Sequence, residues 1–304
     1  MRVKSVTIIT LTYNNFDLIT SAISSVFVQE LSPEYELEYL IVDDCSKYFD
    51  GGFILDYVST LKGKVNTKII RNPVNVGTVK SFNNAIKNSN GDIIIPLSAD
   101  DMFNDCDSVS RIIKSFDLNG ANVITALRDV YSRDLGEFKG QFPISSQKHL
   151  FNEGNEKKLL KKLYVNGNII SGANTYYRRE YLLQNGLFDE GYVLLEDYPF
   201  YIKVLEQGDK ICLLNEVTII YRDGGVSTNK KNKNSKLSDD FDKLYKSFLD
   251  VDFLSKKEKK WIFFSRILSR NEKMKFSILI KYFDMFVVLL CLRIKSFLLK
   301  ITDF

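Results

Sequence analysis

The sequence has few of the residues that several common kinds of functional site require. It contains one histidine, His149, so a zinc site built on two or three histidines is excluded. A serine–histidine–aspartate triad would have to use that residue, and no G-x-S-x-G motif accompanies it. The four cysteines are scattered without a C-x-x-C pair, which favours a reducing, cytoplasmic location over a disulfide-stabilised secreted fold.

Neither the net charge nor the uncharged run near the C-terminus indicates nucleic-acid binding or a membrane span. Lys and Arg total 42 against 38 Asp and Glu, a net charge of +4, which is far from the basic footprint of a nucleic-acid-binding protein. The uncharged run 285–292 is well short of the roughly 20 apolar residues that span a bilayer. The apolar content of 45% over 304 residues supports one large α/β unit with appendages, or two domains.

Strand-like and helix-like patterns alternate through the first hundred residues. Amphipathic segments that predict helices begin near residues 15–17 and 75–78. The predicted strands around them are 5–12, 39–42, 68–71 and 93–97. This alternation predicts an α/β fold with a Rossmann-like, mainly parallel sheet flanked by helices. Beyond Gly120 the pattern loosens, and the clearest later elements are helices at 157–165 and from 196 to Gly208, then a strand at 211–221.

Two of the predicted strands run directly into paired acids. Asp43 and Asp44 follow one strand, and Asp100 and Asp101 follow another. The carboxyl ends of parallel strands meet at one edge of a sheet, where open α/β folds bind their ligands. Either pair alone is also explained as turn residues and helix caps. The two pairs together favour a ligand site at this edge.

Five short motifs resemble those of family 2 glycosyltransferases with the GT-A fold, of the bacterial surface-polysaccharide type. They lie at 11–14, 41–44, 75–77, 97–101 and 196–197, in the family's order and spacing. The similarity covers about residues 1–225. It implies an inverting enzyme that transfers a hexose from a UDP-sugar to a saccharide acceptor. It also implies that the acceptor is lipid-linked and the pathway is bacterial capsule, O-antigen or exopolysaccharide biosynthesis.

The resemblance implies a nucleotide-sugar site on the first strands. Family members hold the base and ribose with the end of the first strand and the acid after the second, which correspond here to Thr12, Tyr13, Asn14 and Asp43. A carboxylate at Asp43 would accept the N3–H of uracil, which favours a UDP-sugar. Asp44 is expected to cap a turn. Two further donor-site residues come from the third motif, Asn75 and Gly77.

The resemblance also implies a divalent cation, Mn²⁺ or Mg²⁺, on a D-x-D motif. Ser98 replaces the first aspartate, so we expect a hydroxyl contact to the donor there and Asp100 as the metal ligand. Asp101 either contacts the donor sugar or caps the following helix. Arg222 is a candidate for the pyrophosphate, with Ser227 in the same loop, and an exposed loop arginine is the alternative.

The E-D motif implies the acceptor side of the site. Asp197 corresponds to the family's catalytic base, with Glu196 beside it as a supporting acid. The start of a helix favours the ionised form of such a base. Gly172 would line the acceptor side, where the absent side chain allows a close approach. The alternative is that both acids only complement the helix dipole.

We expect a catalytic domain over 1–227, with a nucleotide-sugar-binding half at 1–101 and an acceptor-binding half at 102–227, followed by a basic helical region at 228–304. Residues 228–242 are rich in Asn, Lys, Ser and Asp, which predicts a mobile loop or domain boundary. Wound as one helix, 273–301 carries a broad apolar arc flanked by lysines. Peripheral contact with the inner face of the plasma membrane and packing against protein both explain this arc. No oligomeric state follows from the sequence.

Two other functions remain open at this point. A sugar nucleotidyltransferase also uses an α/β sheet and acidic metal ligands, but it would need a glycine-rich loop after the first strand, and residues 12–16 lack one. A catalytically inactive, membrane-associated scaffold of the same fold is suggested by the missing first aspartate of the metal motif.

Overall fold

The structure is a computed structural model that describes residues 2–63, 65–225 and 234–302. The chain divides into two compact units, residues 1–163 with 168–240 and residues 164–167 with 241–304. The predicted boundary at residues 227 and 228 falls in 226–233, as does Ser227, and so lies outside the described residues.

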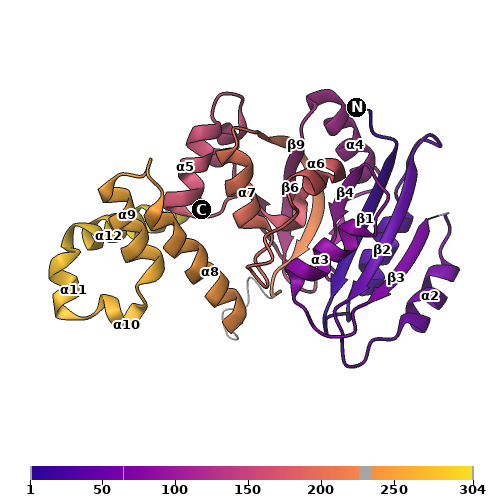
Figure 1. Ribbon diagram of the computed structural model, residues 1–304, viewed down its shortest axis with the longest axis horizontal. Helices are drawn as coiled ribbons and strands as arrows, with labels where there is room; N and C mark the ends of the chain where they lie inside the picture. Colours follow the sequence, from indigo (N-terminus) through magenta and orange to yellow (C-terminus); the bar gives the residue numbers. More distant parts are fainter. Residues whose placement is uncertain (1, 64, 226–233, 303–304) are drawn as a thin grey trace. The chain divides into compact units, whose positions relative to one another are not determined.

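The first unit is built on one mixed sheet with the strand order β3-β2-β1-β4-β8-β6-β9-β5, and β7 pairs with β6. Its first four strands in this order are parallel neighbours (Figure 1). They are β1 (Ser5–Thr12), β2 (Glu36–Asp43), β3 (Asn66–Arg71) and β4 (Ile93–Pro96). The later strands are β5 (Met102–Phe103), β6 (Val123–Tyr131), β7 (Phe138–Phe142), β8 (Thr175–Arg178) and β9 (Ile211–Arg222). The predicted α/β fold with a mainly parallel Rossmann-like sheet is confirmed.

The helices of this unit alternate with the strands along the chain. They are α1 (Ile19–Phe27), α2 (Gly51–Thr60), α3 (Thr78–Lys87), α4 (Ser108–Asn119), α5 (Glu156–Asn166), α6 (Arg179–Gln184) and α7 (Asp197–Glu206). Short 3-10 turns occur at Ser145–Phe151 and Gly172–Asn174. Parallel neighbours need such crossover connections, because a tight hairpin can join only antiparallel strands.

One core cluster of this unit contains one set of alternate strand residues. Ile8 and Ile41 of the sheet pack there with Ile23 of α1, Ile54 of α2 and Phe116 of α4, all buried. A cluster of aromatic rings connects β8 with α3, α7 and the segment before α7. In it Phe188 contacts the rings of Phe82, Tyr177 and Phe200 at centroid distances of 5.1, 5.6 and 5.2 Å. The contacts with Tyr177 and Phe200 are edge-to-face, an arrangement that stabilises packing beyond the apolar area it buries.

The second unit is helical. Its helices are α9 (Lys256–Ile262), α10 (Arg270–Lys273), α11 (Phe276–Lys281) and α12 (Phe283–Thr302), with a π-helical turn at Phe263–Ile267. Buried Phe264 forms its small core with Tyr282 and Met285. None of the described helices combines the length and the apolar character needed to cross a bilayer.

Two sequence predictions need correction in this part of the chain. Residues 235–247 form helix α8 (Ser235–Ser247), so the C-terminal half of the predicted loop 228–242 is helical. The predicted single helix over 273–301 is divided, because α11 ends at Lys281 and α12 begins at Phe283. Between them Tyr282 leaves helical geometry and its ring stacks on Phe264 at 5.7 Å, so core packing prevails over the continuous apolar pattern.

Candidate functional site

The candidate site begins where the first strands end. In the sheet register Thr12 of β1 is paired with Asp43 of β2, and Asp43 is paired with Arg71 of β3. The motif at 98–101 follows the neighbouring strand β4, which runs parallel to β1. The motifs that the sequence places after strands therefore share one edge of the sheet.

Asp43 is fully buried at this edge. Its carboxylate accepts a hydrogen bond from the backbone N–H of Ser46 and lies 3.3 Å from Nε of Arg71. The guanidinium of Arg71 is half exposed and also donates to the backbone oxygen of Ser46. Sequence reasoning missed Arg71, although its place at the end of the third predicted strand was a usable signal.

The first-strand motif is tied to the loop after β2. Asn14 has a left-handed backbone with φ +52°, its N–H donates to Oγ of Ser46, and its side-chain oxygen accepts from the N–H of Lys47. Thr12 is buried and its hydroxyl donates to the backbone oxygen of Asn15. Tyr13 is 51% exposed. The structure thus brings Thr12, Tyr13, Asn14 and Asp43 together around one loop, with the tyrosine ring available to a ligand.

Asp44 holds the third motif. Its carboxylate accepts from the N–H groups of Val76 and Gly77 at 2.9 and 2.8 Å, and from the side chain of Asn72. Gly77 has φ +87°, and a side chain there would come within 2.6 Å of the backbone oxygen of Val193. Asn75 is exposed on the same loop. This contact connects the loop at 75–77 to the segment that leads into Glu196.

The motif at 98–101 is packed against Arg222 of β9. Oδ1 of Asp101 accepts from the backbone N–H of Arg222 at 2.9 Å, and the Arg222 side chain donates to the backbone oxygen of Asp100 at 2.7 Å. Arg222 is only 5% exposed, so its guanidinium supports the backbone of the acidic motif from the protein interior. Burial, reinforced by the charge of Asp100, raises the pKa of Asp101 to about 7.

Asp100 and Asp101 fit a divalent cation by their donor chemistry. In the described part of the chain Oδ2 of Asp101 is buried and has no hydrogen-bond partner. A side chain at Gly225 would come within 3.5 Å of Oδ2 of Asp100, so the glycine leaves that side of the carboxylate uncovered. Ser98, half-buried, contributes its backbone oxygen to the Asp101 N–H. Carboxylate oxygens are the ligands that Mn²⁺ and Mg²⁺ prefer.

Asp197 lies at the start of α7, as predicted. Its Oδ1 accepts from the N–H of Tyr198 and its Oδ2 accepts from the N–H of Gly172 at 3.1 Å. A side chain at Gly172 would come within 3.2 Å of Oδ2 of Asp197, so the absent side chain allows this contact. The N–H donors lower the pKa of Asp197 as the helix-start argument expects, but burial outweighs them and the net pKa is raised. Burial and the Asp197 charge raise the pKa of Glu196 as well.

Asp240 of α8 holds the segment before this acid pair. Its buried carboxylate accepts from the N–H groups of Val193, Leu194 and Leu195 at 2.9, 2.6 and 3.1 Å. A carboxylate that satisfies several consecutive N–H groups fixes the path of a backbone. Sequence reasoning missed Asp240, because it falls in the stretch that composition predicts to be a loop.

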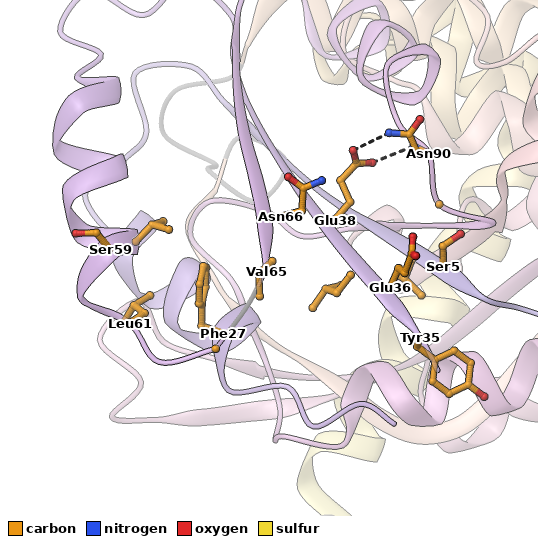
Figure 2. A pocket seen from close by; sticks show the side chains of 15 residues that line it. Ser5, Phe27, Tyr35, Glu36, Glu38, Ser59, Leu61, Val65, Asn66 and Asn90 are labelled. Atoms are coloured by element: carbon orange, nitrogen blue, oxygen red, sulfur yellow. Dashed lines mark hydrogen bonds between the residues drawn. The ribbon is translucent and has the colours of Figure 1, made fainter. Parts of the chain in front are cut away.

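A separate cavity of about 930 Å³ lies at the other edge of the sheet, near the amino ends of the strands. Ser5, Glu36, Asn66 and Asn90 line it, and Figure 2 shows the carboxylate of Glu38 bonded to Asn90 there. Glu38 also accepts from Thr7 and Lys68, so its oxygens are fully occupied. This cavity contains none of the predicted site residues.

The family model described as glycosyl transferase family 2 matches residues 7–185, more than half of the chain. The chain belongs to this family. The predicted glycosyltransferase activity is thereby confirmed as a class, and a sugar nucleotidyltransferase is not supported. No curated protein is similar enough in sequence to match.

Solved structures share the GT-A fold with this family member. The 1–349 portion of S. aureus TarS in complex with UDP-GlcNAc superposes with a TM-score of 0.62 at 21% identity, covering 94% of this chain and 79% of that one. This chain spans only 44% of the longer TarS chain, at a TM-score of 0.58 and 19% identity. A mannosyltransferase from Pyrobaculum calidifontis, in complex with GDP-Man and Mn²⁺, gives a TM-score of 0.61 at 15% identity, covering 86% of this chain and 68% of that one. At these identities the likeness establishes the fold alone.

Proposed function

We propose that this protein transfers a hexose from a UDP-sugar to a saccharide acceptor with inversion, using a divalent cation. The acceptor is lipid-linked and the pathway is bacterial capsule, O-antigen or exopolysaccharide biosynthesis. The main support is that Asp44, on the donor side, is connected by a chain of contacts to Glu196 and Asp197, on the acceptor side. Asp44 holds Gly77, Gly77 packs on Val193, and the segment from Val193 leads into Glu196 and Asp197.

The donor occupies the side of the site near β1 and β2. Tyr13 offers an exposed ring to the base, and Asp43 with Arg71 offers a paired acceptor and donor to its edge. A uracil N3–H would have to reach the buried carboxylate of Asp43, which requires Arg71 to move aside. The half-exposed Arg71 is free to do so. Uracil suits this pair because it carries both a donor and carbonyl acceptors.

Asp100, with Asp101 beside it, would hold the cation. When bound, a divalent cation offsets the negative charge of the diphosphate as the sugar leaves. With a pKa of about 7, Asp101 is partly protonated near neutral pH without a cation, and a bound cation would favour its ionised form. The solved mannosyltransferase with GDP-Man and Mn²⁺ supports metal use in this fold.

Asp197 acts as the base in this proposal. The acceptor hydroxyl attacks the anomeric carbon from the face opposite the diphosphate, its oxygen–carbon bond forms, and the carbon–oxygen bond to the phosphate breaks. The hydroxyl proton passes to Asp197 and the nucleoside diphosphate departs. The pKa of Asp197 is raised toward neutral pH, which makes its carboxylate a stronger base. Glu196 lies beside it on the acceptor side.

The test uses a panel of UDP- and GDP-sugars with Mn²⁺ and a pyrophosphate-lipid saccharide acceptor, scored by release of the nucleotide. Asp197→Asn should reduce the rate at least a hundredfold, because the hydroxyl proton loses its acceptor. Asp189→Asn is the matched control, since Asp189 is an exposed acid whose carboxylate accepts from the N–H of Gly191 in its own turn. Wild-type release as slow as that of Asp197→Asn would instead support an inactive scaffold.

We also propose that the second unit contacts an anionic lipid surface, where a lipid-linked acceptor resides. Exposed apolar side chains follow helical spacing along α11 and α12. They are Phe276, Ile280, Phe283, Val287, Leu290 and Ile294, between 44% and 78% exposed. Exposed Lys275 and Lys281 adjoin this stripe and would pair with anionic headgroups.

Flotation with vesicles tests the lipid contact. The protein should float with anionic vesicles, and Phe283→Ser with Leu290→Ser should abolish this, while Asp284→Ser on the same helix should not. Equal flotation of all variants would contradict the proposal. Loss of a dimer in the double variant without any lipid binding by the wild type would show that the stripe packs against a second copy.

A further inference from the structure

Arg128 of β6 is a partly buried cation to which the proposed function gives no role. Its Nε is buried without a hydrogen-bond partner, and it forms no ion pair with any carboxylate in the described part of the chain. Its guanidinium is 4.0 Å from the ring centroid of Tyr221 and 5.2 Å from that of Phe142. The two rings pack against the guanidinium, and the hydroxyl of Tyr221 also hydrogen-bonds it. The Nε–H is left without a partner among the described residues.

Arg128 lies between Asp101 and Asp197. On one side, Tyr221 precedes Arg222, whose N–H bonds Asp101. On the other side, the side chain of Asn174 bonds the backbone oxygen of Ala126, two residues before Arg128, and the turn containing Asn174 begins at Gly172. Gly172 in turn donates to Asp197. The charge of Arg128 lowers the pKa of both Asp101 and Asp197, as its position between them requires.

In the described part of the chain, neither Asp101 nor Asp197 is hydrogen-bonded to the guanidinium of Arg128. Asp101 accepts from the backbone of Arg222, and both oxygens of Asp197 accept backbone N–H groups. Burial lowers the pKa of Arg128, but the ordinary pKa of a guanidinium is so far above neutrality that the group keeps its proton. Its unpartnered Nε–H is therefore available to an anion that enters the site. The planar fork of an arginine matches two oxygens of a phosphate.

We propose that Arg128 binds a phosphate oxygen of the donor's diphosphate at the point where the sugar is released. This rests on the proposed function, in which the diphosphate lies at Asp100 and the acceptor hydroxyl at Asp197. The leaving phosphate oxygen must then lie between these acids, which is where Arg128 is. The sequence suggested Arg222 for this contact, but the Arg222 side chain is bonded to the backbone of Asp100. Arg128 stabilises the oxygen as its charge grows during bond breaking.

The experiment compares a nucleoside diphosphate with its nucleoside. Binding of UDP, or of GDP if the wild type prefers it, is measured by calorimetry with Mn²⁺, and binding of the free nucleoside by ligand-observed NMR. Arg128→Gln should weaken nucleoside diphosphate binding by about tenfold to a hundredfold, the usual effect of one charge-assisted contact, and leave nucleoside binding unchanged. Arg128→Lys should lose less, because it keeps the charge but not the fork.

Arg133→Gln is the matched control. Arg133 follows the same strand, is 48% exposed, and pairs only weakly with exposed Asp17 at 3.6 Å. It should bind like the wild type. Equal weakening of nucleoside and nucleoside diphosphate in Arg128→Gln would overturn the proposal, because the pocket itself would be damaged. Unchanged diphosphate binding would also overturn it, including the case in which only the KM for the acceptor rises. A wild-type protein that binds neither UDP nor GDP would refute the proposed function instead.

Discussion

Replacing Asp240 by alanine removes the acceptor of three consecutive backbone N–H groups, those of Val193, Leu194 and Leu195. This segment leads directly into Glu196 and Asp197, and Val193 also accepts the N–H of Val79. The variant therefore removes a contact that supports Glu196 and Asp197 while leaving both acids in place.

The expected loss of stability follows from these contacts. Hydrogen bonds to a charged acceptor contribute roughly 1.5–3 kcal/mol each, and water that enters the vacated space recovers part of this. Because Asp240 is only 5% exposed, we expect recovery to be incomplete and the free energy of unfolding to fall by about 3 kcal/mol. Asp240→Asn should also be destabilised, because its amide would turn an N–H group toward backbone N–H groups.

The kinetic effect should be larger on turnover than on donor binding. A displacement of about 1 Å at a base can lower a rate a hundredfold, so we expect kcat to fall at least tenfold in Asp240→Ala. The KM for the donor should change little, since the side chains of Thr12 and Asp43 at the strand ends bond Asn15 and Ser46 rather than this segment. Denaturant unfolding measures the first effect, and steady-state nucleotide release measures the second.

Asp239→Ala is the control for this prediction, because Asp239 is the exposed neighbour on the same helix. It should match the wild type in both assays. Wild-type stability and kcat in Asp240→Ala would refute the reasoning. An equal rise of the donor KM and fall of kcat would show that the whole fold, rather than the segment at 193–197, depends on Asp240.

Three further predictions follow from glycines and acids of the site. Gly77→Ala should lower the free energy of unfolding by about 3 kcal/mol, because φ is +87° and the new side chain meets Val193; Gly208→Ala, with φ +83° and open space around it, should lose only about 1 kcal/mol in the same denaturant assay. Without a cation, stability should fall as pH rises from about 4 to 7, because the pKa of Asp101 is about 7 in the fold and near 3.8 when unfolded, so the unfolded state binds fewer protons. Asp101→Asn should flatten this slope in pH-dependent melting, and an unchanged slope would contradict the raised pKa. Chelation with EDTA should abolish transfer and added Mn²⁺ should restore it, whereas activity that persists after chelation would contradict the role of Asp100.

Local pattern predicts the first half of the fold well. The predicted strand at 5–12 coincides with β1, and the predicted strands at 39–42 and 68–71 lie within β2 and β3. Buried parallel strands are short continuous apolar runs, and the helices between them have clear 3.6-residue spacing, so each element carries its own signal. The motifs at the strand ends then meet at one edge because of the parallel topology.

The second half was harder to predict because its contacts are distant in sequence. β6 pairs in parallel with β9 and in antiparallel with β7 and β8, and no periodicity within residues 123–131 encodes those partners. Arg128 was therefore missed, although it lies between Asp101 and Asp197. Asp240 was missed for a different reason: its polar surroundings in sequence resemble a loop, and only packing reveals its bonds to 193–195.

The bond between Asp240 and the segment at 193–195 bears on how this enzyme can be divided or recombined. The family match ends at residue 185, before either acid of the E-D motif, and the acceptor of the backbone groups at 193–195 comes later still, on α8. A fragment cut before residue 235 would retain every residue assigned to donor and acceptor but lose the carboxylate that orders the base. Chimeras that exchange acceptor specificity should therefore keep α8 and residues 193–197 from the same parent.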